Sequence, residues 1–339
     1  MQKHTRLQYD QYLNQIATLN DVPSAAQKFV VTPSVQQKLE SKMQESSQFL
    51  GKINIIGVTE QEGEKLGLGI GGPVSSTTNT ETTDRVTTDP STIDGSGYKC
   101  TQTNFDTHIK YAKLDMWAKF ADFQTRIRDH LLQRNALDRI MIGFNGTSRA
   151  ATSNKVANAL LQDVNIGWLQ KIRANAPERW LKEVASASNA VQVGAAVTPA
   201  NGYKNLDALV FDVVNELIDP WYREDSGLVV IAGRKVVADR YFSMVNVAQQ
   251  PTEQLATQIL MSTISLGALP VVRVPYFKDN ALLITRLDNL SLYFQEGARR
   301  RTLVDNAKRD QIENYESSND AFVIEDYGMT ALVENIVLS

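Results

Sequence analysis

The chain has 339 residues, of which 42% are hydrophobic and 22% charged, with a formal net charge of −3. This composition is typical of a globular protein with one large or two moderate cores, and it excludes a chain that is disordered throughout. The charge argues against tight binding of nucleic acid by the chain alone, because such proteins usually carry a basic excess or a basic face.

The first segment, residues 1–22, is predicted to be an amphipathic helix that ends at residues 21–24. Its apolar residues recur at helical spacing and are Tyr9, Tyr12, Leu13, Ile16 and Leu19. This face has no partner nearby in the sequence, so it must dock elsewhere in the fold or on another chain. Residues 33–50 predict a second short helix closed by Gly51, and residues 53–58 predict a strand.

Residues 63–97 are rich in Thr, Ser, Gly and Asp and contain almost no large apolar residue after Ile70. Such a segment cannot bury enough surface to offset its ordering entropy, and it exceeds the usual loop length of about 12–15 residues. Its flanks, 52–69 and 98–111, alternate as strands do. We predict a long two-stranded ribbon with a polar, mobile tip. An isolated ribbon is marginal in water, so we expect a neighbouring subunit to stabilise it.

The strongest helical pattern runs from Lys113 to Phe144. The apolar residues recur at steps of three, four and seven and are Phe120, Phe123, Ile127, Leu131, Leu137, Met141 and Phe144. One helix over this range would be roughly 45 Å long at 1.5 Å per residue. That is longer than most helices of globular domains, so we expect it to be the backbone of an elongated body.

The rest of the chain mixes helices and strands without the regular alternation of a doubly wound sheet, which favours an α+β fold. Helical pattern lies within residues 159–183, 206–218 and 235–241, and residues 185–201 predict a loop or irregular hairpin. Strands are predicted at residues 228–232, 271–274, 281–285, 290–295, 311–317, 321–326 and 331–337.

No motif with catalytic, cofactor-binding or metal-binding chemistry is found. The glycine-rich stretch 67–72 is followed by Pro73 and a Thr/Ser tract, whereas a phosphate-binding loop must lead into a helix. No histidine lies in a ligand spacing; the three are His4, His108 and His130. No GxSxG is present, although a triad need not be adjacent in sequence. We therefore expect no enzyme, and a hydrolase with an unrecognised site remains an alternative.

The sharpest basic cluster is Arg299, Arg300 and Arg301. Three adjacent arginines are more often a solvated loop or an intersubunit ion-pair site than a DNA groove. A nucleic-acid-binding structural protein is the other alternative, and it would use these residues with a steep salt dependence.

Membrane insertion and disulfide bonding are not expected. The longest apolar runs fall far short of the roughly 20 residues that cross a bilayer, and the N-terminus lacks the apolar region of a secretory signal. Cys100 is the single cysteine, so no intrachain disulfide can form.

Long stretches spread over the whole chain carry a family resemblance. The longest are LQDVNIGWLQKIRANAP (161–177), DPWYREDSGLVVIAGRKVVADRYF (219–242), NLSLYFQEGARRR (289–301) and ENYESSNDAFVIEDY (313–327). With these residues the chain resembles the major capsid proteins of P2-like tailed bacteriophages (peduoviruses), which share the HK97-like capsid fold. Order and spacing agree from the N-terminus to about Glu334.

The resemblance implies an HK97-like subunit of five successive parts. They are an N-terminal arm (1–58), an extended loop or E-loop (59–112), a peripheral domain with a spine helix (113–224), an axial domain (225–305) and return strands of the peripheral domain (306–339). The arm and the loop would each lack a partner within one subunit and gain one from its neighbours.

The resemblance also implies what the chain assembles into and with which partners. Pentamers and hexamers of the chain would form an icosahedral shell, first a procapsid and then a mature head, around double-stranded DNA contacted weakly and non-specifically. Its partners would be an internal scaffold, a protease and a portal protein. The chain would assemble in the host bacterial cytoplasm and would be located in the virion. It would need no cofactor and would not bind a membrane. The protease would remove residues 1–29, with the boundary near Lys28, Phe29 and Val30.

Some capsids of this fold cross-link through a lysine in the extended loop. This chain has no lysine between Leu66 and Tyr98, so we do not expect a cross-link at the loop tip. We expect intersubunit contacts at charged residues of the loop and of the basic cluster, namely Lys65, Arg85, Lys99, Arg299, Arg300 and Arg301.

Overall fold

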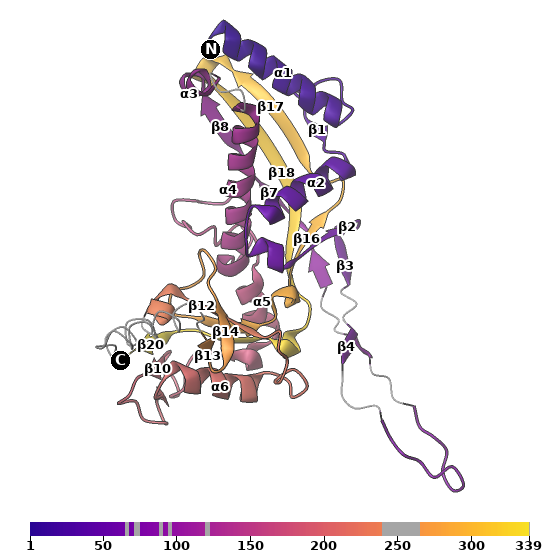
Figure 1. Cartoon of the computed structure of the whole chain (residues 1–339), viewed down its shortest axis with the longest axis vertical. Coiled ribbons are helices and arrows are strands. Elements are labelled where there is room, and N and C mark those ends of the chain that lie inside the picture. Colours follow the sequence, from indigo (N-terminus) through magenta and orange to yellow (C-terminus); the bar gives the residue numbers. More distant parts are fainter. Residues whose placement is uncertain are drawn as a thin grey trace, which may run out of the picture. The chain divides into compact units, whose positions relative to one another are not determined.

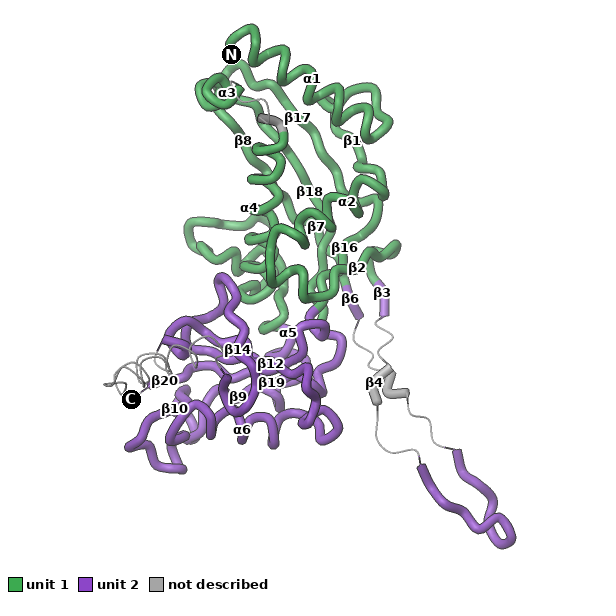
Figure 2. The backbone as a smooth tube through the Cα atoms, in the orientation of Figure 1, with its two compact units in different colours: residues 1–62, 99–170, 291–323 green, residues 63–98, 171–290, 324–339 purple. Residues whose placement is uncertain are grey.

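The computed structural model describes residues 1–64, 68–70, 75–87, 91–93, 97–118, 123–238 and 265–338 (Figure 1). The chain forms two compact units, each assembled from separate segments (Figure 2). Unit 1 consists of residues 1–62, 99–170 and 291–323, and unit 2 of residues 63–98, 171–290 and 324–339. The predicted division at residues 224/225 and 305/306 into peripheral domain, axial domain and return strands stays a prediction.

Unit 1 is built around a seven-stranded sheet in the order β1-β17-β18-β16-β2, with β7 and β8 also paired to β18. The strands are β1 (Phe29–Val30), β2 (Asn54–Val58), β7 (Thr101–Asn104), β8 (Thr107–Lys110), β16 (Leu290–Gln295), β17 (Arg300–Asn306) and β18 (Gln311–Ile324). β18 pairs antiparallel with β17, β7 and β8, while β16 and β2 are parallel. The predicted strands at 53–58 and 290–295 are confirmed.

Strand β18 corrects one prediction. The sequence pattern suggested two strands, 311–317 and 321–326, but the structure has one strand of 14 residues. Two of the three polar residues between the predicted strands are buried: Ser318 is 1% and Asp320 2% exposed. The Ser318 hydroxyl donates to Asp320, and both side chains accept from Arg139. Because these polar groups satisfy one another, the strand continues through them.

Four helices of unit 1 are α1 (Lys3–Leu19), α2 (Pro33–Glu45), α3 (Tyr111–Trp117) and α4 (Phe123–Asn145). The first two confirm the predicted helices, although α2 ends before residue 50 and a short 3-10 helix follows at Leu50–Lys52. The single long helix from Lys113 to Phe144 is not observed, because α3 ends at Trp117. Phe120 lies outside the described residues. The 23 residues of α4 span about 35 Å.

The C-terminal end of α4 packs around Trp168. This indole is 1% exposed, lies 5.1 Å from the rings of both Phe144 and Phe322, and donates to the carbonyl of Ser291. A Cβ atom on Gly143 would lie 2.2 Å from the indole, so this close approach requires glycine.

Unit 2 contains a six-stranded sheet, β13-β14-β12-β15-β19-β9, and a three-stranded sheet, β11-β10-β20. The strands are β9 (Trp180–Leu181), β10 (Val191–Val193), β11 (Gly202–Tyr203), β12 (Val229–Ala232), β13 (Ser265–Leu266), β14 (Leu269–Val272), β15 (Leu282–Thr285), β19 (Ala331–Val333) and β20 (Ile336–Leu338). Helix α6 (Leu206–Leu217) packs its apolar face on this core and is capped by Asn205, whose side chain accepts from the Ala208 amide.

Several predictions for this part of the chain are confirmed and others are corrected. Helix α6 and strands β12 and β15 lie where expected. Within residues 159–183 the only α-helix is α5 (Trp168–Asn175). The predicted strand 331–337 is two strands, because Asn335 takes a left-handed φ of 58° between them. Residues 234–238 are helical, and the rest of the predicted helix 235–241 lies outside the described residues.

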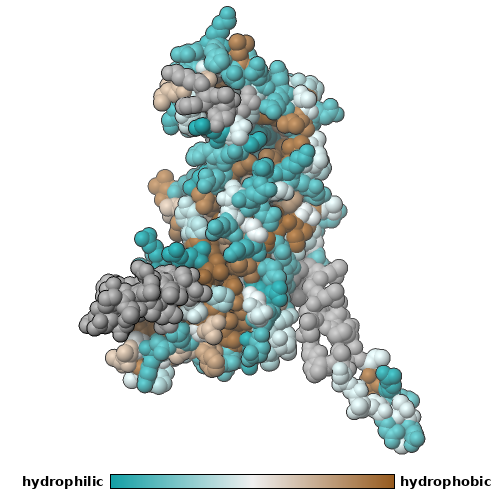
Figure 3. Space-filling view, in the orientation of Figure 1, coloured by the Kyte–Doolittle hydropathy of each residue, from teal (hydrophilic) through white to brown (hydrophobic). Residues whose placement is uncertain are grey.

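The predicted ribbon is present in its described parts. β3 (Glu62–Glu64) pairs with β6 (Gly97–Lys99), and β4 (Leu68–Ile70) pairs antiparallel with β5 (Ser91–Ile93). The ribbon is shorter than predicted, because residues 101–104 and 107–110 pair with β18 instead. At the tip, residues 75–87 are largely exposed and mostly hydrophilic (Figure 3).

Candidate assembly site

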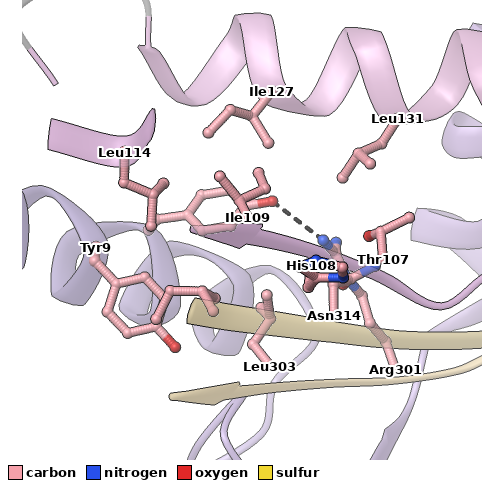
Figure 4. A pocket seen from close by; sticks show the side chains of 12 residues that line it. Tyr9, Thr107, His108, Ile109, Leu114, Ile127, Leu131, Arg301, Leu303 and Asn314 are labelled. Atoms are coloured by element: carbon pink, nitrogen blue, oxygen red, sulfur yellow. Dashed lines mark hydrogen bonds between the residues drawn. The ribbon is translucent and has the colours of Figure 1, made fainter. Parts of the chain in front are cut away.

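Helix α1 packs its apolar face within the same subunit. Tyr9 and Ile16 are each 6% exposed and belong to a core cluster with Leu303 of β17, Ile312 of β18 and Ile127 of α4 (Figure 4). Of the two docking places expected for this face, elsewhere in the fold or on another chain, the structure shows the first. The expectation that the arm has no partner inside one subunit is wrong, since β17, β18 and α4 supply one.

Polar contacts fix α1 on β17. Arg6 donates to Asp305 at 2.5 Å, and the Tyr111 hydroxyl donates to the same carboxylate. Arg301 donates to the Tyr12 hydroxyl at 3.1 Å. Burial alone would raise the pKa of Asp305, but the hydrogen bonds from Tyr111 and Arg6 outweigh it and lower that pKa. The bond to Asp305 raises the pKa of Tyr111 to about 12.

A cavity of about 40 Å³ remains beneath α1, and mainly apolar side chains line it (Figure 4). Ligand sites usually enclose about 300–1,000 Å³, so this cavity is too small to bind a cofactor or substrate. It marks imperfect packing between the arm and the sheet.

The predicted cleavage region lies at the edge of the sheet. Lys28 is exposed, Phe29 is 8% exposed and Val30 is 49% exposed, as expected for alternating residues of a strand. β1 pairs antiparallel with β17, and the Val31 amide donates to the Arg299 carbonyl at 2.9 Å. The region is thus extended and hydrogen-bonded along one side.

The basic cluster 299–301 is not a solvated loop, because β17 begins within it. Arg299 is 1% exposed, which corrects the prediction that it contacts another subunit. Arg301 is partly buried, points toward the arm and donates to Asn314 at 2.8 Å. Arg300 is exposed on the opposite face of the strand.

Arg299 belongs to a buried charge network of five side chains: Glu40 on α2, Arg139 on α4, Arg299, and Glu316 and Asp320 on β18. Arg299 lies 2.7 Å from Glu40, and Arg139 lies 3.1 Å from Asp320. Arg139 also pairs with Glu40. Each of the five side chains is less than a tenth exposed.

Each of the three carboxylates in the network lies beside at least one of the two arginines. Burial and the nearby Glu40 raise the pKa of Asp320, although Arg139 opposes this. Burial would also raise the pKa of Glu316, but the charge of Arg299 outweighs it and lowers that pKa. Only Arg299 of these five residues stands out in the sequence, because the other four come from segments far apart in the chain and carry no shared local pattern.

The charged residues of the ribbon have different environments. Lys65 lies outside the described residues. Lys99 is exposed and forms an ion pair with Glu62 across the base of the ribbon, and Arg85 at the tip is exposed.

All three histidines are exposed: His4, His108 and His130. Within the described ranges, no group of three or more His, Cys, Asp or Glu side chains is placed to hold a metal ion. In the same part of the chain, no helix is both long and apolar enough to cross a membrane.

Known proteins resemble the chain over nearly its full length. The family described as phage major capsid protein, P2 family, matches residues 8–336. A protein of Escherichia phage P2 described as capsid proteins is 47% identical, over 99% of this chain and 95% of that protein. The major capsid protein of Serratia phage KSP20 is 40% identical, over 100% of this chain and 98% of that protein.

Solved structures give the fold. A chain of the satellite phage P4 procapsid, which includes the size determination (Sid) protein, is 45% identical with a TM-score of 0.83 and covers 100% of this chain and 99% of its own length. A capsid chain of an empty GTA particle is 14% identical with a TM-score of 0.52, over 86% of this chain and 90% of that one, and supports the fold alone. The predicted α+β, HK97-like capsid fold is confirmed.

Proposed function

Because this chain belongs to the P2 family of phage major capsid proteins and forms the capsid shell as a component of the virion, we propose how its parts serve that role. Its copies occupy pentamers and hexamers of an icosahedral shell that encloses double-stranded DNA. The match to one capsid family along almost the whole chain carries this proposal. The chain has a structural role and no catalytic one, with assembly in the host cytoplasm.

The two units and the ribbon correspond to the parts of an HK97-like subunit. We assign unit 1, with α4 as the spine helix, to the peripheral domain, and residues 171–290 of unit 2 to the axial domain. The ribbon between β3 and β6 is the extended loop. Support comes from the order of these parts along the chain, which is the order that the family resemblance implies.

Residues 1–29 form a removable assembly segment. The internal scaffold binds the exposed face of α1 in the procapsid, and a protease then cuts near Lys28, Phe29 and Val30. Two features support this proposal: Lys28 and Val30 are exposed, and β1 is an extended strand at the sheet edge, the backbone form in which peptides add to β-sheets.

Contacts with packaged DNA are weak and non-specific, and a portal protein occupies a separate position in the shell. The formal net charge of −3 supports weak binding of DNA. The alternative of a nucleic-acid-binding protein loses support, because Arg299 is buried in ion pairs and Arg301 is partly buried under the arm.

The test is to express the full chain with the scaffold protein of its phage and to image the product by electron microscopy. Uniform icosahedral shells are expected. Monomers or small oligomers under all conditions would contradict the proposal, and tight binding of duplex DNA with a steep salt dependence would favour the alternative.

A further inference from the structure

The assembly segment, residues 1–29, has two possible fates after the proposed cut: it leaves the subunit or it stays bound. Hydrolysis of one peptide bond near Lys28, Phe29 and Val30 takes up one water and leaves a carboxylate on the segment and an amino group on the next residue. It breaks none of the contacts that the side chains of the segment make with unit 1. These contacts therefore decide where the segment goes.

The apolar cluster beneath α1 is shared equally between the assembly segment and the rest of unit 1 (Figure 4). Each of its ten buried residues is at most 9% exposed. The segment contributes Tyr9, Ile16, Ala17, Ala25 and Phe29, and the rest of unit 1 contributes Val31, Leu114, Ile127, Leu303 and Ile312. Departure of the segment would open the second set to water, at a free-energy cost that grows with the apolar area exposed.

Polar contacts hold both ends of the assembly segment on unit 1. Three lie at the start of α1 and two lie shortly before the proposed cut, and their lengths run from 2.5 to 3.3 Å. They join the Gln2 amide to Asp115, His4 to the Ala118 carbonyl, Arg6 to Asp305, and the carbonyls of Ala25 and Ala26 to the Leu303 amide and the Thr302 hydroxyl.

We propose that the assembly segment stays bound to unit 1 as a separate peptide after the cut. The sheet and α4 then form a peptide-binding cleft whose occupant is residues 1–29 of the same chain. Each subunit supplies one segment and one cleft, so the two match in number. The inference rests on the proposed function, because it requires that a protease cuts the assembled chain.

Loss of the covalent link weakens binding of the segment but does not abolish it. The cut turns an intramolecular contact into an intermolecular one, so the effective concentration of the segment falls. In a shell of many copies, however, a segment that leaves one cleft finds identical clefts on neighbouring subunits, which favours rebinding. The cleft also matches the segment in charge, since Asp305 receives Arg6 and Arg301 donates to Tyr12.

Retention of the segment gives the cut a specific effect, which is to separate α1 from α2. Helix α2 keeps its own buried contacts, since Glu40 pairs with both Arg139 and Arg299. After the cut, α2 can move together with α4 and β17 without pulling α1 through the peptide chain. The apolar surface beneath α1 stays covered throughout.

The number of segments in cut shells tests the proposal. Full-length chain is assembled with the scaffold protein and the protease of its phage, and electron microscopy and a gel establish that shells form and that the chain is cut. After dialysis, mass spectrometry with isotope-labelled standard peptides counts segments and shortened chains. We expect equal numbers of the two.

Hydrogen exchange distinguishes a bound segment from one that is only enclosed in the shell. A short isolated helix is marginal in water, whereas a docked helix is protected from exchange. Exchange of residues 3–19 in cut shells should be roughly ten-fold or more slower than in a synthetic peptide of residues 1–29. Equal rates would overturn the proposal, as would shells that contain shortened chains but no segment.

Two matched pairs of variants locate the contacts that retain the segment. I16A removes a side chain that is 6% exposed and should lower the ratio of segments to shortened chains several-fold, whereas L7A, at a position 55% exposed, should not. If I16A does not assemble, R6Q removes the pairing with Asp305, and K3Q changes an exposed lysine in the same turn. Equal ratios within the pair that assembles would overturn the proposal.

The outcomes separate this inference from the function on which it rests. If shells form and the chain is cut, but the segment is absent or exchanges as the free peptide does, the inference is overturned and the proposed function stands. If no shells form, or the chain in them is not cut, the proposed function is overturned and the inference with it.

Discussion

The guanidinium of Arg299 lies 2.7 Å from the carboxylate of Glu40, and both side chains are almost completely excluded from solvent. The two residues are 259 positions apart in sequence, so the ion pair joins helix α2 to the turn before β17. Glu316 pairs with Arg299 and Arg139 pairs with Glu40, so the ion pair is part of a larger network. Loss of any one of these side chains would leave an uncompensated charge in the core.

Replacing Arg299 by Met should therefore destabilise the subunit strongly. Glu316 would lose its ion-pair partner inside the core, and breaking a buried pair in this way costs about 3–5 kcal/mol. Urea unfolding of the unassembled full chain measures the change in free energy. R300M is the matched control, because Arg300 is exposed, and should change stability by less than about 0.5 kcal/mol.

If R299M does not fold, R299K keeps the charge at this position and should give an intermediate stability. Equal stability of R299M and R300M would contradict the structural role of the network.

Replacing Tyr9 by Ala should loosen the arm and speed tryptic cleavage after Lys28. Tyr9 is 6% exposed against β17 and β18, so its loss removes apolar contacts that hold α1 beside the cleavage region. The rate of appearance of the shortened chain on a gel measures the effect, which should be several-fold. L7A is the control, because Leu7 is on the same helix and 55% exposed. Equal rates for Y9A and L7A would show that α1 does not protect this bond.

Local periodicity predicted the elements whose burial follows the sequence pattern. The arm helix, α6, β12 and β16 each present one apolar face or run to a core, so spacing alone located them. The same reasoning failed at β17 and in the middle of β18, where arginines and a Ser-Ser-Asn-Asp run looked like loops. Their burial depends on ion pairs and hydrogen bonds to distant segments, and no local pattern encodes that.

The candidate site was predictable to a similar extent. The polar ribbon tip follows from the sequence, and the place of the proposed cleavage region follows from the family resemblance. The register of β17 against β1 and β18 decides two features that the sequence does not show. One is the docking of α1 within its own subunit, and the other is the placement of Arg299, Arg300 and Arg301 in three different environments. A shift of one residue would exchange the buried and exposed faces of that strand.

Attachment of the arm should weaken in acid because of Asp305. The folded-state pKa of this carboxyl is below its ordinary value, so the stability it contributes is present above the unfolded pKa of about 3.9 and is lost as pH falls through the folded pKa. Hydrogen exchange of residues 3–19, corrected for intrinsic rates, should rise as the pH is lowered below about 4. In D305N, exchange should be faster at neutral pH and lack this acid-dependent step. The same pH dependence in both proteins would assign it to other groups.

Deleting residues 73–97 should leave a folded subunit that assembles poorly. The described tip residues in this range are largely exposed, and Lys99 of β6 remains to pair with Glu62 of β3 at the base of the ribbon. Thermal unfolding of the unassembled chain should therefore change little, whereas electron microscopy should show few or no closed shells. A Gly/Ser segment of equal length in place of residues 73–97 is the control for chain length, and it should also fail to assemble if the side chains of the ribbon make the contacts between subunits. Normal shells from the deletion would show that the ribbon is not required between subunits, while a large loss of thermal stability would show that it belongs to the fold of a single subunit.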